Sequence, residues 1–292
     1  MLRKFSAAFI LLLAFSFSVT LLGIETAQVY FPGTLESFWI YEDQDGNELS
    51  RVAIEGEEIA DKTYPAFSYE PELEDWAEYS PFIRPSLYNV SDAGITLVAK
   101  DEIGKALQAR LKKETDILVD IMKGVAPPDA GIDVDIEVKG HDHSFLLPDT
   151  ITINEEWDVN QFEVDVKMHF RGGDVPENEQ LTVDFTIVET GIVLGTETVE
   201  TIAGTFEDCL KVEYRTETTA AMTPDPPPDE VEPPGETVTT VWYAPNIGIV
   251  KFHQETNYIF LEMIPDDEGL PVPPGPKIKT YELKRYEIKP AE

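Results

Sequence analysis

Apolar and polar residues alternate over most of the chain, which is the pattern of β-strands with one buried face. Two alternating runs between residues 37 and 69 flank Asp45-Gly46-Asn47, a sequence typical of a hairpin turn. From residue 131 onward, further alternating runs follow one another with short turns between them. Strands that succeed one another without intervening helices predict an antiparallel sheet.

One segment changes to the period of an α-helix. Acidic residues begin it at Asp101, Gly124 ends it, and two prolines at 127 and 128 prevent its continuation. We expect one long amphipathic helix at about 101–123, packed against the sheet with its basic residues in water. A helix on a membrane surface or on a partner is the alternative. Its apolar stripe is predicted to face a ligand and consists of Ile103, Leu107, Leu111, Leu118 and Met122.

The N-terminus has the layout of a secretory signal. Arg3 and Lys4 precede an uncharged run from Phe5 to Ile24. We expect residues 1–27 to be a signal peptide, or an anchor if it is not cleaved, because the run is long enough to cross a bilayer. The sequence therefore predicts an exported protein, located in a periplasm, on the cell surface or outside the cell.

The remaining chain is predicted to form two β-rich lobes. The N-terminal lobe spans 28–140 and includes the helix, and the C-terminal antiparallel lobe spans 141–292, with proline-rich loops at 223–235 and 264–276. A short, gapped similarity between the segments that begin at Ser50 and Thr190 suggests two related halves.

Charge and cysteine content exclude several classes of partner and of fold. The chain has 56 acidic and 22 basic residues and a formal net charge of −34 at pH 7. Such a charge repels nucleic acid and anionic lipid, so we expect membrane contact only through an uncleaved N-terminal segment. A single cysteine cannot form an internal disulfide, and the fold must therefore depend on its core.

The single cysteine, Cys209, is not predicted to be a nucleophile. Its neighbours Glu207 and Asp208 raise the pKa of a thiol, whereas a nucleophilic cysteine needs a lowered pKa. Strict alternation places Cys209 on the face opposite to Leu210 and Val212, although a bulge would reset this pattern. We assign no catalytic residue and no cofactor, because no phosphate loop, serine elbow or zinc-protease helix is present.

Two histidines form the strongest candidate for a metal site. His141 and His143 are two residues apart and share one face of an extended segment. A tetrahedral zinc site needs further ligands from elsewhere in the fold. A polar turn is the alternative interpretation of the same residues.

Two motifs carry a resemblance to a known family. The segment AGTFEDCLKV, from Ala203 to Val212, is followed by WYAPNIGIVK, from Trp242 to Lys251. Together they resemble a bacterial exported domain of unknown function, over about 148–254. That domain is similar to the open half-barrels of periplasmic lipoprotein carriers, in which a curved sheet holds an acyl chain under a helical lid. Trp242 and Tyr243 lie on opposite strand faces, and we expect them to contact the ligand.

These observations predict a mainly β protein with a curved antiparallel sheet or half-barrel and one helix. We expect a non-enzymatic cell-envelope protein that binds a lipid, another apolar ligand or an envelope protein in a concave surface. A structural or adhesive module with a filled core is the first alternative. A metal-dependent hydrolase that uses His141 and His143 is the second.

Overall fold

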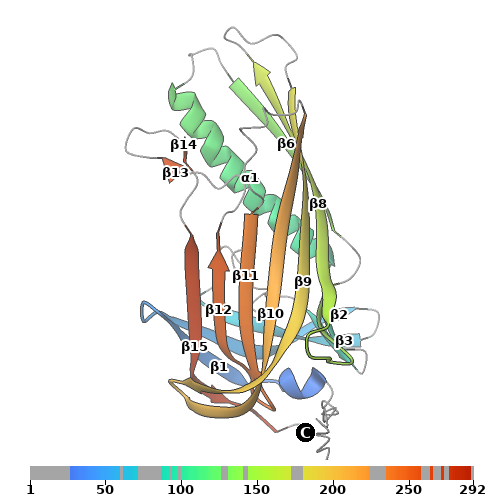
Figure 1. Cartoon of the computed structure of the whole chain (residues 1–292), viewed down its shortest axis with the longest axis vertical. Helices are drawn as coiled ribbons and strands as arrows, with labels where there is room; N and C mark the ends of the chain where they lie inside the picture. Colours follow the sequence, from blue (N-terminus) through green and yellow to red (C-terminus); the bar gives the residue numbers. More distant parts are fainter. Residues whose placement is uncertain are drawn as a thin grey trace, which may run out of the picture.

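The structure is a computed structural model and describes residues 27–59, 62–71, 87–91, 94–97, 100–125, 131–140, 144–171, 180–223, 235–257, 264–265, 271–272 and 276–290. Within these residues one ten-stranded sheet dominates the fold (Figure 1). Its strands are β1 (Phe38–Asp43), β2 (Glu48–Ile59), β3 (Lys62–Glu70), β6 (Gly131–Gly140), β8 (Glu156–Arg171), β9 (Gln180–Thr201), β10 (Gly204–Thr223), β11 (Gly235–Ala244), β12 (Gly248–Thr256) and β15 (Lys277–Glu287).

The strand order is β3-β2-β1-β15-β12-β11-β10-β9-β8-β6, and each neighbouring pair is antiparallel. Strands β3 and β6 are therefore the two edges of an open sheet. The sheet contains strands from both predicted lobes, and the division at residue 140 stays a prediction. Short hairpins join β1 to β2, β2 to β3, β9 to β10 and β11 to β12, whereas the other connections are longer. Pairing of β15 with β1 brings the C-terminal end of the chain beside its beginning.

Smaller elements lie beside this sheet. A second sheet has the order β4-β5-β7, formed by β4 (Tyr88–Ser91), β5 (Gly94–Leu97) and β7 (Phe145–Pro148). A short 3-10 helix, η1 (Ala27–Tyr30), precedes β1, and β13 (Ile264–Pro265) pairs with β14 (Pro271–Val272) inside the second proline-rich segment. The helix α1 (Lys100–Val125) is the one predicted at about 101–123. No helix of the described residues is long and apolar enough to span a membrane.

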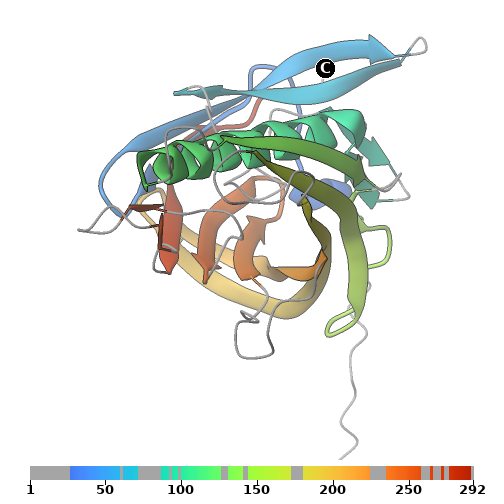
Figure 2. The same ribbon diagram turned by 90° about the horizontal axis from the view of Figure 1, so that it is seen from above.

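The large sheet is strongly curved, and α1 lies along its open side (Figure 2). Register shifts interrupt several ladders, including β1 with β15, β9 with β10 and β8 with β9. Such bulges bend a strand and increase its twist, which favours a trough over a flat sheet. The predicted fold class, a curved antiparallel sheet with one helix, is confirmed.

The predicted hairpin at Asp45-Gly46-Asn47 connects β1 to β2. One carboxylate oxygen of Asp43 accepts hydrogen bonds from the backbone N–H groups of Asp45 and Asn47, at 2.9 and 2.8 Å. Gly46 has a φ of 85°, which glycine adopts without steric penalty. The turn is thus fixed by local side-chain chemistry, as the sequence predicted.

An aromatic core fills the lower end of the trough, between β1 to β3, the small sheet and the lower halves of β9 to β12. We use this name for the buried rings Phe31, Trp39, Tyr41, Phe67, Tyr88, Tyr214, Tyr243 and Phe252 and the aliphatic residues packed on them. Phe67 contacts Phe31, Trp39 and Tyr88 with centroid separations of 5.4 to 5.8 Å in edge-to-face geometry. Aromatic contacts of this kind add stability beyond simple burial.

Candidate functional site

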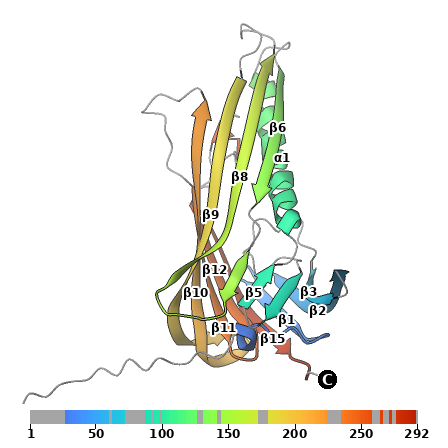
Figure 3. The ribbon, with the colours of Figure 1, turned by 90° about the vertical axis from the view of Figure 1, so that its right-hand side faces the viewer.

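The helix α1 lies beside β6 at the upper end of the sheet (Figure 3). It covers an apolar wall of side chains there. The buried members of this apolar wall come from β8 and β9, and Leu111 of the helix packs into them: Val164, Val166, Met168, Val183 and Phe185. The side chain of Gln108 donates a hydrogen bond to the carbonyl of Ile136 on the edge strand β6, at 2.8 Å. The helix therefore both covers the wall and satisfies part of an exposed sheet edge.

Many apolar side chains of the same wall stay only half-buried beneath the helix. They alternate along β6 and continue on the neighbouring strands: Ile132, Val134, Ile136, Val138, Phe170, Leu181, Ile187 and Met222. In the aromatic core below, by contrast, buried apolar side chains outnumber the half-buried ones. The lower half of the trough is thus filled with the chain's own side chains, whereas the upper half keeps accessible apolar surface.

The predicted ligand-facing stripe of the helix is described only in part. Leu111 is buried against the apolar wall, and Leu107 is half-buried where it contacts both the wall and the aromatic core. The side chains of Ile103, Leu118 and Met122 lie outside the described part of the structure. That these residues face a ligand stays a prediction.

Trp242 and Tyr243 lie on opposite faces of β11. The hydroxyl group of Tyr243 is 3.4 Å from that of Tyr214, inside the aromatic core, and burial raises the pKa of both phenols well above its ordinary value. On the other face, Trp242 Nε1 donates a hydrogen bond to Glu197 at 2.5 Å. The ammonium group of Lys211 lies 5.3 Å from the Trp242 ring. A ligand contact by either aromatic residue stays a prediction.

A polar band crosses the concave face between the aromatic core and the apolar wall. Strand register places its members on adjacent strands: Asn160 beside Glu189, Glu189 beside Thr216, and Thr239 beside Gln254. Gln254 donates a hydrogen bond to Thr239 at 3.1 Å, and Asn160 donates one to Ser144 at 2.6 Å. Polar groups buried in this way must be hydrogen-bonded, so the band fixes the side chains at the centre of the trough.

The aromatic core contains a buried cation, Arg51 of β2. Its guanidinium carbon lies 3.5 Å from the ring centroid of Phe67 and 5.3 Å from those of Phe31 and Trp39. The side chain is 3 % exposed. The phenol groups of Tyr41 and Tyr69 interact with its guanidinium group, but Nε and Nη2 have no hydrogen-bond partner among the described residues. Alternation along β2 places Arg51 inward with Leu49 and Ala53, a position that the sequence analysis did not single out.

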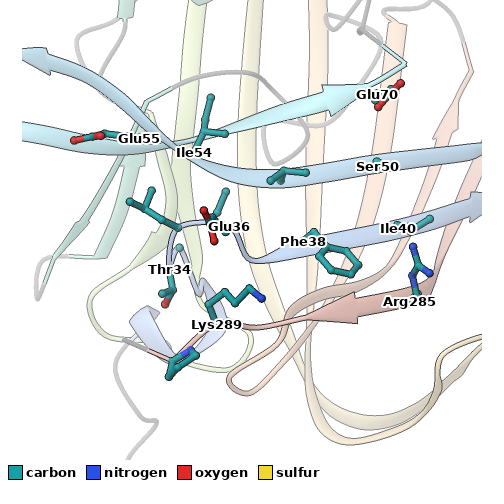
Figure 4. A pocket seen from close by; sticks show the side chains of 15 residues that line it. Thr34, Glu36, Phe38, Ile40, Ser50, Ile54, Glu55, Glu70, Arg285 and Lys289 are labelled. Atoms are coloured by element: carbon teal, nitrogen blue, oxygen red, sulfur yellow. The ribbon is translucent and has the colours of Figure 1, made fainter. Parts of the chain in front are cut away.

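A groove of about 1200 Å³ lies on the opposite, outer face of β1 and β2 (Figure 4). Phe38, Ile40 and Val52 line it, and charged side chains such as Arg285 and Lys289 stand at its rim. Sequence reasoning missed this groove. The signal was the apolar run Phe38–Tyr41, which has no polar alternate positions and therefore makes both faces of β1 apolar.

The predicted chemistry of metal and thiol can be compared with the structure only in part. His141 and His143 lie outside the described residues. Among the residues that are described, no group of three or more His, Cys, Asp or Glu side chains is placed to hold a metal ion. Cys209 is fully buried at a bulge where Asp208 has a φ of 54°. Burial raises the pKa of this thiol to about 11, so it is not an activated nucleophile.

The protein is thus a mainly β protein, built as an open antiparallel trough with a helix along its open side. The family model described as DUF3108-like matches residues 88–257, which is more than half of the chain, and the protein belongs to this family. The matched region contains α1 and both sequence motifs, and the resemblance stated from those motifs is confirmed.

Two solved structures are similar over most of the chain. One is described as a lipoprotein from Parabacteroides distasonis ATCC 8503, with 15% identity, a TM-score of 0.34 and coverage of 89% of this chain and 98% of that one. The other is described as an exported protein with a YmcC-like fold from Bacteroides fragilis NCTC 9343, with 14% identity, a TM-score of 0.35 and coverage of 88% and 98%. No curated protein matches the chain.

Proposed function

We propose that the protein is exported from the bacterial cytoplasm and acts in the cell envelope as a non-enzymatic carrier of an apolar molecule. The molecule would lie on the apolar wall beneath α1. Export is supported by Arg3 and Lys4 ahead of the uncharged run that ends at Ile24. A strongly negative net charge suits a protein that works in solution beside membranes of the same sign.

The observation that carries this proposal is the difference between the two halves of the trough. Apolar side chains of the wall are half-buried on four positions of β6, although a helix lies over them. A contiguous apolar surface that a protein does not bury itself is typical of a binding site. The filled aromatic core supports the alternative, a structural or adhesive module, for the lower half alone.

A binding experiment tests the proposal. Purified mature protein is titrated with a fluorescent fatty acid, and native mass spectrometry is used to look for co-purified lipid. We expect saturable binding, because a buried acyl chain gains about 0.8 kcal/mol for each CH₂ group. A clean apo mass together with no uptake of the fluorescent fatty acid contradicts the carrier function and favours the filled module.

Two variants of α1 locate the site. Leu111→Glu places a charge in the apolar wall and is expected to weaken fatty-acid binding by about 10-fold or more. Ile117→Glu is the matched control, because Ile117 lies on the same helix and is 41% exposed. Circular dichroism confirms that both variants fold. Equal loss of binding in the two variants places the ligand elsewhere.

A further inference from the structure

Arg51 is the one residue of the aromatic core that carries a permanent charge. Guanidinium groups stay protonated in proteins, so a positive charge is held in an almost dry environment. Burying a charge is expensive unless it is paired and hydrogen-bonded. The π faces of Phe67, Phe31 and Trp39 offset part of this expense. The phenol groups of Tyr41 and Tyr69 also interact with the guanidinium group, but Nε and Nη2 have no acceptor among the described residues.

The two unpartnered atoms lie on the same edge of the guanidinium plane. Nε and Nη2 each carry an N–H that points outward along that edge, and the two bonds run nearly parallel. This fork matches the two oxygens of a carboxylate or a phosphate, which it binds in a bidentate manner. The ring of Phe67 lies against the face of the guanidinium, so the fork is held in a fixed orientation.

Two other described arginines pair with acidic side chains. Arg171 pairs with Asp133 at 2.6 Å, and Arg215 pairs with Glu213 and Glu236. Arg51 differs although the chain contains 56 acidic residues, because its Nε and Nη2 atoms have no hydrogen-bond partner among the described residues. A charge that the protein leaves without an acid is the feature expected of an anion site.

The surroundings of Arg51 are continuous with the apolar wall. Leu107, Val138 and Ile187 each pack against both the wall and the aromatic core. Tyr88 of β4 contacts Phe67 in the ring cluster, and the β4–β5 hairpin leads directly into α1. Tyr69, the register partner of Arg51 on the edge strand β3, is only half-buried.

We infer that Arg51 binds the anionic group, a carboxylate or a phosphate, of the molecule whose apolar part lies under α1. This inference rests on the proposed function and narrows it to amphiphilic anions. The apolar wall binds the apolar part of the ligand, and the Nε and Nη2 groups of Arg51 bind its anionic end. An apolar molecule with a neutral end meets the same wall but leaves the fork unpaired.

Three probes of equal chain length test the inference: hexadecanoate, 1-hexadecanoylglycerol 3-phosphate and hexadecanol. Affinities are measured by displacement of the fluorescent fatty acid. We expect wild type to bind at least one anion about 10- to 100-fold more tightly than hexadecanol, the range of a hydrogen bond to a charged group. The preferred anion distinguishes a fatty-acid carboxylate from a lipid phosphate.

Variants identify the residue responsible. Arg51→Met is expected to remove the preference for the anion while hexadecanol still binds, and Arg51→Lys, which keeps the charge without the fork, is expected to keep only part of it. Arg285→Met is the control, because that arginine also stands over an aromatic ring, Phe38 at 5.5 Å, but on the outer face. If Arg51→Met does not fold, the anion preferences of wild type and Arg51→Lys are compared instead.

The outcomes separate the inference from the proposed function. Equal affinity of wild type for all three probes overturns the inference and leaves the carrier function intact. The same follows if folded Arg51→Met, or Arg51→Lys where Met does not fold, keeps the full anion preference. Failure of all three probes to bind overturns the carrier function, and the inference with it. A crystal structure of the hexadecanoate complex with water alone at Nε and Nη2 also overturns the inference.

Discussion

The indole of Trp157 lies against the backbone of Gly191, its register partner on β9. A Cβ atom at position 191 would come within 2.4 Å of Cζ2 and 2.6 Å of Cε2 of the indole. The ring cannot move away easily, because Trp157 Nε1 donates a hydrogen bond to the carbonyl of Phe145 at 3.0 Å and the indole packs edge-to-face with Tyr214. Glycine at 191 therefore allows an aromatic ring to enter the trough at this level.

Gly191→Ala is expected to lower the free energy of unfolding by about 1–3 kcal/mol, the usual effect of overpacking. Urea denaturation followed by tryptophan fluorescence measures this difference. Gly131→Ala is the control, since its added methyl group would meet no atom closer than 3.9 Å, and we expect a change within about 1 kcal/mol. Equal stability of Gly191→Ala and wild type would contradict the close packing of the indole.

Local sequence patterns predicted the elements of this fold better than their arrangement. The helix at 101–123 and the hairpin at Asp45-Gly46-Asn47 depend on residues close in sequence, so periodicity and turn chemistry were sufficient. The position of β15 between β1 and β12 depends on pairing across most of the chain, to which alternation is insensitive. The order of the strands could therefore not be predicted from the sequence, although the antiparallel class of the sheet could.

The candidate site shows the same limit. Leu107 and Leu111 were predicted from their spacing, and both pack on the sheet. Arg51 was missed because the segment SRVAI does not show which strand face is buried. Val52 and Ile54 are more apolar than Arg51 and Ala53, so alternation favoured burial of the face opposite to Arg51. The bulge at Asp208, which buries Cys209, depends on a single left-handed residue that no period reveals.

Buried phenols predict how the protein responds to alkali. Burial raises the pKa of Tyr41 to about 12, and its hydroxyl group donates a hydrogen bond to the carbonyl of Ile249 at 3.0 Å. Because the folded pKa lies above the ordinary phenol value of 10.0, the neutral phenol contributes stability below pH 10.0 that is lost as the pH rises toward 12. The chain is expected to unfold in this range, together with the appearance of tyrosinate absorbance.

Tyr41→Phe tests the origin of this alkaline transition. The variant is expected to lose about 1 kcal/mol at neutral pH, since the carbonyl of Ile249 loses its donor, and to show a shallower fall in stability above pH 10.0. Tyr286→Phe, at a half-buried ring, is the control. Parallel stability curves for Tyr41→Phe and wild type above pH 10.0 would show that Tyr41 is not responsible.

Cys209 is expected to be inert in the folded protein. Its thiol is fully buried, its pKa is raised to about 11 by burial, and Sγ lies 3.5 Å from the carbonyl of Phe206. Alkylation by iodoacetamide at pH about 8 should be at least about 100-fold slower than for the unfolded chain, because the thiolate fraction is lower and access is blocked. Mass spectrometry with and without urea measures both rates. Rapid labelling of the folded protein would contradict an inert thiol and support the hypothesis of a catalytic one.

The buried cation Arg51 leads to a prediction on stability that is independent of any ligand. Arg51→Met fills a similar volume without charge, whereas Arg51→Ala leaves a void among Phe67, Phe31 and Trp39. Loss of the cation–π contacts destabilises the Met variant by about 2 kcal/mol. We expect relief of the buried charge to stabilise it by several kcal/mol and to be the larger of the two effects.

We therefore expect Arg51→Met to be at least as stable as wild type in urea denaturation, and Arg51→Ala to be less stable by about 2–5 kcal/mol. A natural residue that is replaced by methionine without loss of stability is retained for a reason other than folding, which is the condition for Arg51 to serve as an anion site. If Arg51→Met is destabilised as strongly as Arg51→Ala, the charge itself holds the aromatic core together, because the cation–π contacts then outweigh desolvation.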